Sequence, residues 1–392
     1  MHLDLTEAHL ALRDELRRYF DAMMTDALRA ELTETESGGP EYHRAMRQLG
    51  ADGWLGLGWP KEYGGQERSP VEQFIFFDEI QRAGFPIPFL TLNTVGPTLM
   101  KYGTDEQKRE FLPRILRGEL HFAIGYTEPG AGTDLASLKT TAVRQGDHYV
   151  VNGQKIYTSL ATVADYIWLA ARTEPNAPKH KGISILIVDA RAPGVAMSPI
   201  HTMGDNLTSA TYYEDVRVPA DRLVGIEHGG WTLITNQLNH ERVALFPVGP
   251  LARMLEETTA WARETRAGDG QTVLSRPWVQ QVLAKVEARL EVLKLMNWRQ
   301  AWNLEVHGEL HPAEASAVKV YGSELYVEAY RALLEVTGEA GQLKAGSPGA
   351  VLGGRLERYY RSYLVLTFGG GTNEVQRDII SMAGLRMPRA DR

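Results

Sequence analysis

Two glycine-containing segments, far apart in the chain, carry the residues best suited to chemistry. The first runs from Tyr126 to Asp134 and reads Tyr-Thr-Glu-Pro-Gly-Ala-Gly-Thr-Asp. The second runs from Phe368 to Arg377 and reads Phe-Gly-Gly-Gly-Thr-Asn-Glu-Val-Gln-Arg. Because glycine has no side chain, a ligand can approach the backbone of such a segment closely and meet its amide groups. Either string alone is more often a turn than a binding site, so the interpretation depends on finding both.

Composition excludes several classes of protein. The chain has 392 residues, of which 43% are hydrophobic and 23% are charged, as expected for a globular protein of two or three domains. A net charge of −7 without a basic tract argues against a nucleic-acid partner. The absence of cysteine excludes disulfides, thiolate zinc sites and cysteine nucleophiles. The start lacks the features of a signal peptide and no apolar run is long enough to span a membrane, so we expect a cytoplasmic protein without a membrane span.

Hydrophobic periodicity predicts helices up to about residue 120. Ser69, Pro70 and Glu72 have the spacing of a helix cap, with proline in the first turn and glutamate three residues after the serine. Phe74, Phe77 and Ile80 then form an apolar stripe. A second short helix is predicted from Asp105 to Phe111, ending before Pro113.

From about residue 121 to 228 the pattern predicts strands. Asn152-Gly153 is typical of a tight hairpin turn, and residues 145–147 are a second turn candidate. The apolar runs 166–170 and 183–188 are predicted to be buried strands. The helical period returns from about residue 229, with a bundle-type stripe at Val279, Leu283, Val286, Leu290 and Leu293. The predicted fold class is therefore mainly α with a central β domain.

Taken together, the two glycine-containing segments resemble the two signatures of the acyl-CoA dehydrogenase family. The runs 102–107 and 111–113 are also similar to family segments, so the resemblance extends nearly from end to end. It implies an N-terminal helical domain over residues 1–120, a small β-barrel that binds the flavin over 121–228, and a C-terminal four-helix bundle over 229–392. It further implies FAD as the cofactor, an acyl-CoA thioester as the substrate, and no metal.

The resemblance also assigns residues to the cofactor. Tyr126 and Thr127 would meet the polar edge of the flavin ring, and Gly132 and Thr133 would lie near the pyrophosphate. Thr133 is also assigned to the substrate. The remaining cofactor positions are Tyr157, Thr158, Ser159, Thr372 and Glu374. Relatives usually carry tryptophan in place of Tyr157, and they use the positions of Thr372 and Glu374 to touch the cofactor of a neighbouring subunit. Without the resemblance, these residues would indicate only a β domain rich in hydroxyls and glycines.

The catalytic base cannot stand at its usual position. Dehydrogenation removes a proton from the α-carbon and needs a carboxylate opposite the flavin. Most relatives place that glutamate where this chain has Gly370. A minority place it on the first bundle helix before an arginine, which corresponds here to Glu241 before Arg242. We therefore expect Glu241 to be the base, with Arg242 structural or facing CoA, His240 solvated or packed, and the Gly370 amide binding the thioester carbonyl.

The resemblance is closest to one subunit of the actinobacterial steroid acyl-CoA dehydrogenases, in the runs 236–245 and 366–380. Two adenosine-side signatures are eroded: residues 261–268 lack Arg-x-Gln-Phe-Gly, and residues 335–341 read Glu-Val-Thr-Gly-Glu-Ala-Gly instead of Gln-x-x-Gly-Gly-x-Gly. This implies oxidation of a steroid side-chain CoA ester by an α2β2 assembly with a homologous second subunit, and an electron-transfer flavoprotein as acceptor. The alternatives are a non-catalytic partner subunit, a homo-oligomeric fatty or branched acyl-CoA dehydrogenase, and an oxidase.

Overall fold

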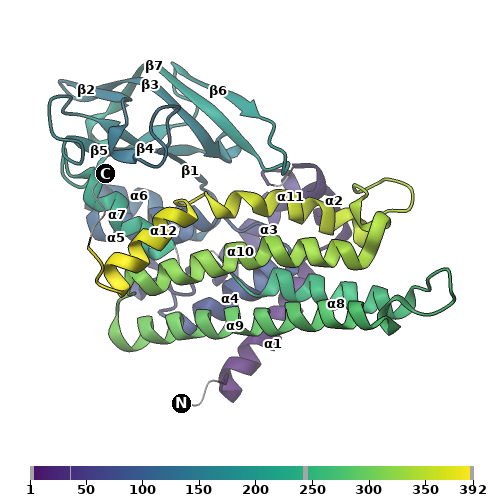
Figure 1. Cartoon of the computed structure of the whole chain (residues 1–392). Coiled ribbons are helices and arrows are strands. Elements are labelled where there is room, and N and C mark those ends of the chain that lie inside the picture. The colour runs from purple at the N-terminus through teal and green to yellow at the C-terminus, as the bar shows by residue number, and fades with distance from the viewer. Residues whose placement is uncertain (1–3, 36, 242–245, 389–392) are drawn as a thin grey trace.

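The computed structural model describes residues 4–35, 37–241 and 246–388, and within these ranges the side chains of residues 236–241 are not described. Helices from both ends of the chain pack along one another, and the central sheet lies against one side of them, at the top of Figure 1. In the described part of the chain, no helix combines the length and the apolar character needed to cross a membrane. The chain is thus mainly α with a central sheet, as the sequence predicts.

The N-terminal helices place one large apolar core beneath the sheet. Their bounds are α1 (Glu7–Met23), α2 (Asp26–Thr35), α3 (Pro40–Ala51), α4 (Pro70–Ala83), α5 (Gly96–Tyr102) and α6 (Asp105–Leu116), with a π-helical turn over Thr91–Val95. The predicted cap of α4 is confirmed: the Ser69 hydroxyl accepts a hydrogen bond from the Glu72 amide at 3.3 Å, and the Glu72 carboxylate accepts one from the Ser69 amide at 2.9 Å. The predicted stripe of Phe74, Phe77 and Ile80 is buried.

The prediction that a helix ends before Pro113 is wrong, because α6 continues through Pro113 to Leu116. Proline removes one backbone donor from the helix. The side chains of Phe111, Leu112 and Ile115 on both sides of it are almost completely buried. Their packing holds the helical path across the proline, so tertiary burial outweighs the local preference.

The sheet curls around a second core. Its strands are β1 (Phe122–Gly125), β2 (Thr141–Gln145), β3 (His148–Ser159), β4 (Tyr166–Arg172), β5 (Ile183–Asp189), β6 (Val195–Ile200), β7 (Thr208–Pro219) and β8 (Leu223–Val224). The strand order is β6-β7-β3-β2-β4-β5-β8, and β1 pairs with β4 in parallel. Side chains of β3, β4, β5 and β7 share this core, so the two halves of the sheet face each other. The predicted buried strands 166–170 and 183–188 are confirmed as parts of β4 and β5.

The predicted hairpin turn at Asn152-Gly153 is wrong. Both residues lie inside β3, and the turn is the second candidate, at residues 145–147, where β2 meets β3. The pairing of β3 with β7 shifts register between Val151 and Gly153, and a Cβ on Gly153 would lie 2.7 Å from Thr140 Cα. Glycine is therefore needed for a bulge and a close backbone approach rather than for a turn.

The C-terminal region begins with α7 (Gly230–Glu241), which lies beside the sheet in Figure 1. The helices after it form the bundle in the middle and lower part of the figure, and their bounds are α8 (Gly249–Glu264), α9 (Pro277–His307), α10 (Pro312–Thr337), α11 (Arg355–Tyr363) and α12 (Asn373–Ile379). The predicted stripe from Val279 to Leu293 is buried on α9. The bundle is fastened to α4: Asp78 Oδ1 accepts hydrogen bonds from the amides of Val248 (2.6 Å) and Gly249 (2.7 Å) at the start of α8. This contact fixes the point at which the chain enters the bundle.

Candidate active site

The segment from Tyr126 to Asp134 directly follows β1 and forms a tight turn. The amides of Glu128 and Ala131 each donate to the other residue's carbonyl, at 3.1 and 3.0 Å. The carbonyl of Thr127 accepts a hydrogen bond from the Ile156 amide at 2.8 Å. This bond places the start of the segment, with Tyr126 and Thr127, beside the end of β3, where Tyr157 and Ser159 lie. The structure therefore brings together two groups of predicted cofactor residues that are separate in sequence.

The two glycines of this turn leave space rather than enabling an unusual backbone. Neither Gly130 nor Gly132 lies in the left-handed region, and a Cβ built on either would meet nothing within 4 Å. Both glycines and Thr133 are exposed. Exposed glycines with open space around them suit the close approach of a bulky group to the backbone. The residues present therefore fit the pyrophosphate of FAD.

The end of β3 presents Tyr157 to solvent through a local distortion. Tyr157 has φ +58° and is 61% exposed, an unusual backbone conformation for a bulky residue. Thr158 is buried, and its Oγ1 lies 3.4 Å from the Thr211 Oγ1. Ser159 is exposed again. The hydroxyl of Thr158 is thus directed into the sheet, and any contact of this residue with a ligand would be made through its backbone.

A buried ion pair that no sequence motif indicates lies beneath the turn. Lys155 is fully buried, and its Nζ donates to Glu128 Oε1 at 2.8 Å and to the Tyr126 carbonyl at 3.0 Å. Burial lowers the pKa of Lys155 to about 8, although the nearby Glu128 carboxylate opposes this shift. Burial alone would raise the pKa of Glu128, but the Lys155 charge and the Thr140 hydrogen bonds hold that pKa below its ordinary value. A sequence signal existed, because strand alternation puts Lys155 on the same inward side as Tyr149 and Val151.

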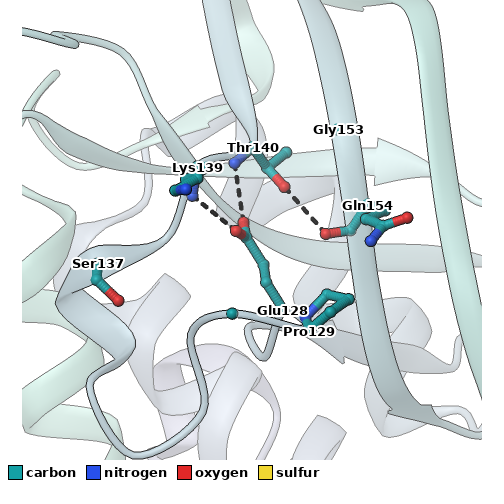
Figure 2. Close-up of a pocket in the computed structure, with 8 residues that line it drawn as sticks. Glu128, Pro129, Ser137, Lys139, Thr140, Gly153 and Gln154 are labelled. Atoms are coloured by element: carbon teal, nitrogen blue, oxygen red, sulfur yellow. Dashed lines mark hydrogen bonds between the residues drawn. The ribbon is translucent and has the colours of Figure 1, made fainter.

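A hollow of about 240 Å³ opens beside this pair. As Figure 2 shows, Glu128 and Pro129 border it on one side, and Gly153 and Gln154 of β3 border it on another. Gly130 of the turn and three residues of the loop that follows it, Ser137, Lys139 and Thr140, complete the wall, and no motif singled out those three. The hollow adjoins the glycine turn, the turn formed by residues 126–134. This face of the sheet is therefore concave next to the predicted cofactor residues.

The second glycine-containing segment is anchored to α10. Thr372 caps α12 by accepting a hydrogen bond from the Val375 amide at 3.3 Å, and Glu374 is exposed in the first turn of that helix. Asn373 is buried, and its Oδ1 accepts hydrogen bonds from Lys319 Nζ at 2.7 Å and Ser323 Oγ at 3.2 Å. Because Asn373 is bonded to α10, its neighbours Thr372 and Glu374 are held in place by the helical bundle and not by the sheet.

The predicted base lies at the end of α7. Glu241 is the last residue of that helix, but its side chain, and all of Arg242, lie outside the described residues. The helix packs against β5 and against the π-helical turn Thr91–Val95. Gly370, where the resemblance leads one to expect the usual base, has φ +68°, which favours glycine over any residue with a side chain.

The eroded signature at residues 335–341 lies where α10 ends. A hollow of about 600 Å³ there is lined by three carboxylates, from Glu335, Glu339 and Glu357, together with Arg331 and Arg361. Arg361 is already paired with Glu357 and with Asp205, the latter at 2.7 Å between Nη1 and Oδ2. The acidic side chains outnumber the basic ones, so this hollow is a poor site for an anion.

A helical region, a curled sheet with a glycine turn after its first strand, and a helical bundle together define the class of acyl-CoA dehydrogenases. Models of the three acyl-CoA dehydrogenase domains match the chain in order: the N-terminal domain over residues 6–119, the middle domain over 123–216 and the C-terminal domain over 228–385. The chain belongs to the acyl-CoA dehydrogenase family.

Individual relatives are similar over the full length. Acyl-CoA dehydrogenase FadE26 of Mycobacterium tuberculosis is 56% identical, with 100% of both chains covered. A chain in the crystal structure of the ChsE4-ChsE5 complex from Mycobacterium tuberculosis is 57% identical, with a TM-score of 0.93 and 100% of both chains covered. A chain in the structure of the Tcur3481-Tcur3483 steroid ACAD is 53% identical, also with a TM-score of 0.93 and full coverage of both chains.

Proposed function

We propose that this chain is the catalytic subunit of a two-chain, FAD-dependent acyl-CoA dehydrogenase that forms an α,β double bond in the CoA thioester of a steroid side chain. The observation that carries the proposal is its full-length similarity to chains of a two-chain complex and of a steroid ACAD. We further propose that the protein works in the cytoplasm and passes its electrons to an electron-transfer flavoprotein.

The chemistry divides between the sheet and the bundle. FAD, when bound, would supply the acceptor for the hydride that leaves the β-carbon. Tyr126, Thr127 and the exposed end of β3 would orient its ring, and the glycine turn would leave room for its pyrophosphate. Glu241 would remove the α-proton, and the Gly370 amide would bind the thioester oxygen, which makes that proton more acidic. Thr133 and Arg242 would contact the substrate.

The acid-lined hollow at the end of α10 supports the two-chain arrangement. In the family this region contacts the cofactor of a neighbouring subunit, and here Glu335 and Glu339 occupy the signature. Carboxylates next to a pyrophosphate would be repulsive once water is excluded. A twin of this chain would therefore be a poor donor of that half of the site. We propose that a homologous but different chain supplies it in an α2β2 assembly, through its own equivalents of positions such as Thr372 and Glu374.

The first test is to express the chain alone and together with a homologous acyl-CoA dehydrogenase chain of the same organism. Flavin absorbance would be recorded before and after a steroidal acyl-CoA is added without oxygen. We expect the pair to retain FAD and to bleach, and the single chain to retain little FAD. A single chain that binds FAD and bleaches would remove the two-chain part of the proposal. A pair that bleaches equally well with straight-chain acyl-CoA would remove the steroid part.

A further inference from the structure

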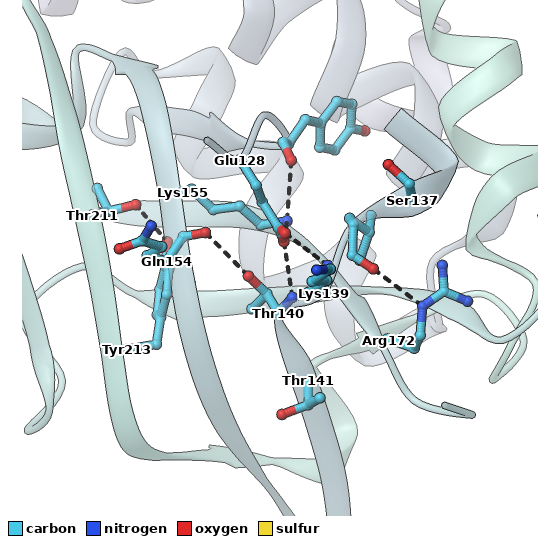
Figure 3. Close-up of polar contacts among 12 residues, drawn as sticks. Glu128, Ser137, Lys139, Thr140, Thr141, Gln154, Lys155, Arg172, Thr211 and Tyr213 are labelled. Atoms are coloured by element: carbon cyan, nitrogen blue, oxygen red, sulfur yellow. Dashed lines mark hydrogen bonds and ion pairs between the residues drawn. The ribbon is translucent and has the colours of Figure 1, made fainter. Parts of the chain in front are cut away.

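The backbone of the glycine turn is held from below by one lysine. Lys155 on β3 directs its ammonium group at the carbonyl of Tyr126, at 3.0 Å, and at Glu128, at 2.8 Å. Figure 3 shows the ammonium group of Lys155 beside Glu128. The group lies below the start of the loop that runs from Tyr126 to Thr140. The lysine therefore fixes a main-chain atom of Tyr126 rather than its side chain.

The partner carboxylate extends this attachment to a second stretch of the loop. The Lys139 and Thr140 amides donate to the two oxygens of Glu128, at 2.7 and 2.9 Å. The carboxylate of Glu128 is thus bonded to β3 through Lys155 and to the far end of the loop through two amides. Removing it would release both connections together.

Arg172 on β4 holds the middle of the same loop in a similar way. Its Nη2 donates to the Ala136 carbonyl at 2.7 Å, and its Nε donates to the Leu138 carbonyl at 3.2 Å. Figure 3 draws Arg172 with a hydrogen bond from its side chain to this loop. From Tyr126 to Thr140, charged side chains bind main-chain groups, so these contacts set the shape of the loop.

Stability alone does not account for a buried pair of this kind. Taking both charges out of water largely offsets their attraction, and apolar replacements of similar volume are often neutral or stabilising. What the pair does supply is a fixed spacing. Lys155 lies two residues before Tyr157 on the same strand, and it bonds directly to Tyr126. One side chain thereby sets the separation of the two segments that are proposed to face the flavin.

We propose that Lys155 and Glu128 are positioning residues of the flavin site, which hold the glycine turn at a fixed distance from the end of β3. This inference rests on the proposed function, because it assumes that FAD binds between these segments. Neither residue needs to touch the cofactor. Their effect on FAD would be transmitted through the main chain of Tyr126 and through the amides of Lys139 and Thr140.

The test compares the wild type with the double variant Lys155→Met/Glu128→Gln. A single substitution would leave an uncompensated buried charge and endanger folding, whereas the double variant removes both charges at similar volume. Lys179→Met is the matched control, because Lys179 forms an exposed ion pair with Asp134 on the same loop. Each protein is produced as the assembled pair of homologous chains. A second sample of each protein is prepared without FAD for the hydrogen-exchange measurement.

We expect the double variant to unfold within a few degrees of the wild type but to bind FAD at least about tenfold more weakly, which corresponds to about 1.4 kcal/mol. Its bound flavin should show an altered visible circular dichroism spectrum. Without FAD, hydrogen exchange of the amides at residues 135–140 should be about tenfold faster or more, as expected for the loss of hydrogen bonds to a charged acceptor. The Lys179→Met protein should match the wild type in all three measurements.

The outcomes separate this inference from the proposed function. A double variant with wild-type FAD affinity and spectrum would overturn the inference and leave the proposed function intact. A lower melting temperature with unchanged FAD binding would show a merely structural pair, and would overturn it as well. A wild-type assembly that binds no FAD would overturn the proposed function and the inference with it.

Discussion

The two glycine-containing segments look alike in sequence but need their glycines for different reasons. Gly130 and Gly132 have ordinary backbone angles and open space around them. Gly370 and Gly371 have φ of +68° and +95°, and a Cβ on Gly371 would lie 2.7 Å from Gln376 Nε2. In the first segment glycine keeps room free, and in the second it makes the backbone path possible. A glycine-rich motif is therefore informative only once the role of each glycine is known.

The largest expected effect tests which segment supplies the base. Since Gly370 has no side chain, Glu241→Gln should lower the turnover number by about 10²–10⁴ while the fold and the FAD content are unchanged. Single-turnover bleaching by substrate without oxygen would measure the loss. His240→Gln, next to it on α7, should keep the wild-type rate. Near-full activity of the Glu241→Gln protein would show that the base lies elsewhere, or that this subunit is not the catalytic one.

The second prediction uses pH to distinguish the two glycine-containing segments. A buried histidine, His121, lies shortly before the first segment in the chain. Burial lowers the pKa of His121 to about 4, even though Asp165 partly opposes the shift. Below pH 6.5, the ordinary pKa of histidine, His121 is protonated in the unfolded chain but stays neutral in the folded chain. The free energy of unfolding therefore falls as the pH drops from about 6.5 to about 4. From pH 6.5 to pH 5 the free energy of unfolding should fall by roughly 2 kcal/mol from this group alone.

Denaturant unfolding at several pH values would measure this slope, and hydrogen exchange would locate it. Exchange should accelerate in β1 and in the turn that follows it before it accelerates in α12. In His121→Asn the slope assigned to this residue should disappear. An unchanged slope in that variant would mean that other groups cause the loss of stability in acid.

The third prediction concerns Gly132 in the first segment. Gly132→Val should leave the melting temperature nearly unchanged, because a Cβ at this exposed position meets nothing within 4 Å, but it should weaken FAD binding by about tenfold or more. Titration of the assembled protein with FAD, combined with thermal unfolding, would test both statements. A stable Gly132→Val protein with normal FAD affinity would contradict the assignment of this turn to the cofactor.

The last prediction concerns Gly371→Ala in the second segment, where the effect is on stability alone. The left-handed backbone should cost the variant about 1–2 kcal/mol of stability, and Gln376 must also move. Gly268→Ala is the control, since that loop glycine has open space and no left-handed backbone. Equal melting temperatures for the two variants would remove the distinction between the segments.

The sequence predicted features that depend on neighbouring residues and failed where distant ones decide. The cap at Ser69 and Glu72 and the α9 stripe are local patterns, and both are confirmed. Pro113 and Asn152-Gly153 were misjudged because core packing and the β3–β7 register override their local preferences. Strand alternation places Lys155 on the inward side of β3, but no local pattern identifies its partners, since Tyr126 and Glu128 lie on another segment.

The candidate site divides in the same way. Recognition of the family through the two segments is confirmed. The structure adds that Tyr126 and Thr127 lie beside the end of β3, because Thr127 bonds to Ile156. It also shows that the hydroxyl of Thr158 is directed into the sheet. The roles of Glu241, Arg242 and the individual cofactor residues stay predictions.

The joint between α4 and α8 has a consequence for how the protein is made. Asp78 bonds to the amides of Val248 and Gly249, and Arg253 Nη1 donates to the carbonyls of Arg82 (3.1 Å) and Ala83 (2.9 Å). These partners are 170 or 171 residues apart in the chain. At about 5–20 residues per second, α4 leaves the ribosome roughly 10–30 s before α8 exists. During that interval this face of α4 has no partner within its own chain. Until α8 is synthesised, this face of α4 is therefore available to other chains and to chaperones.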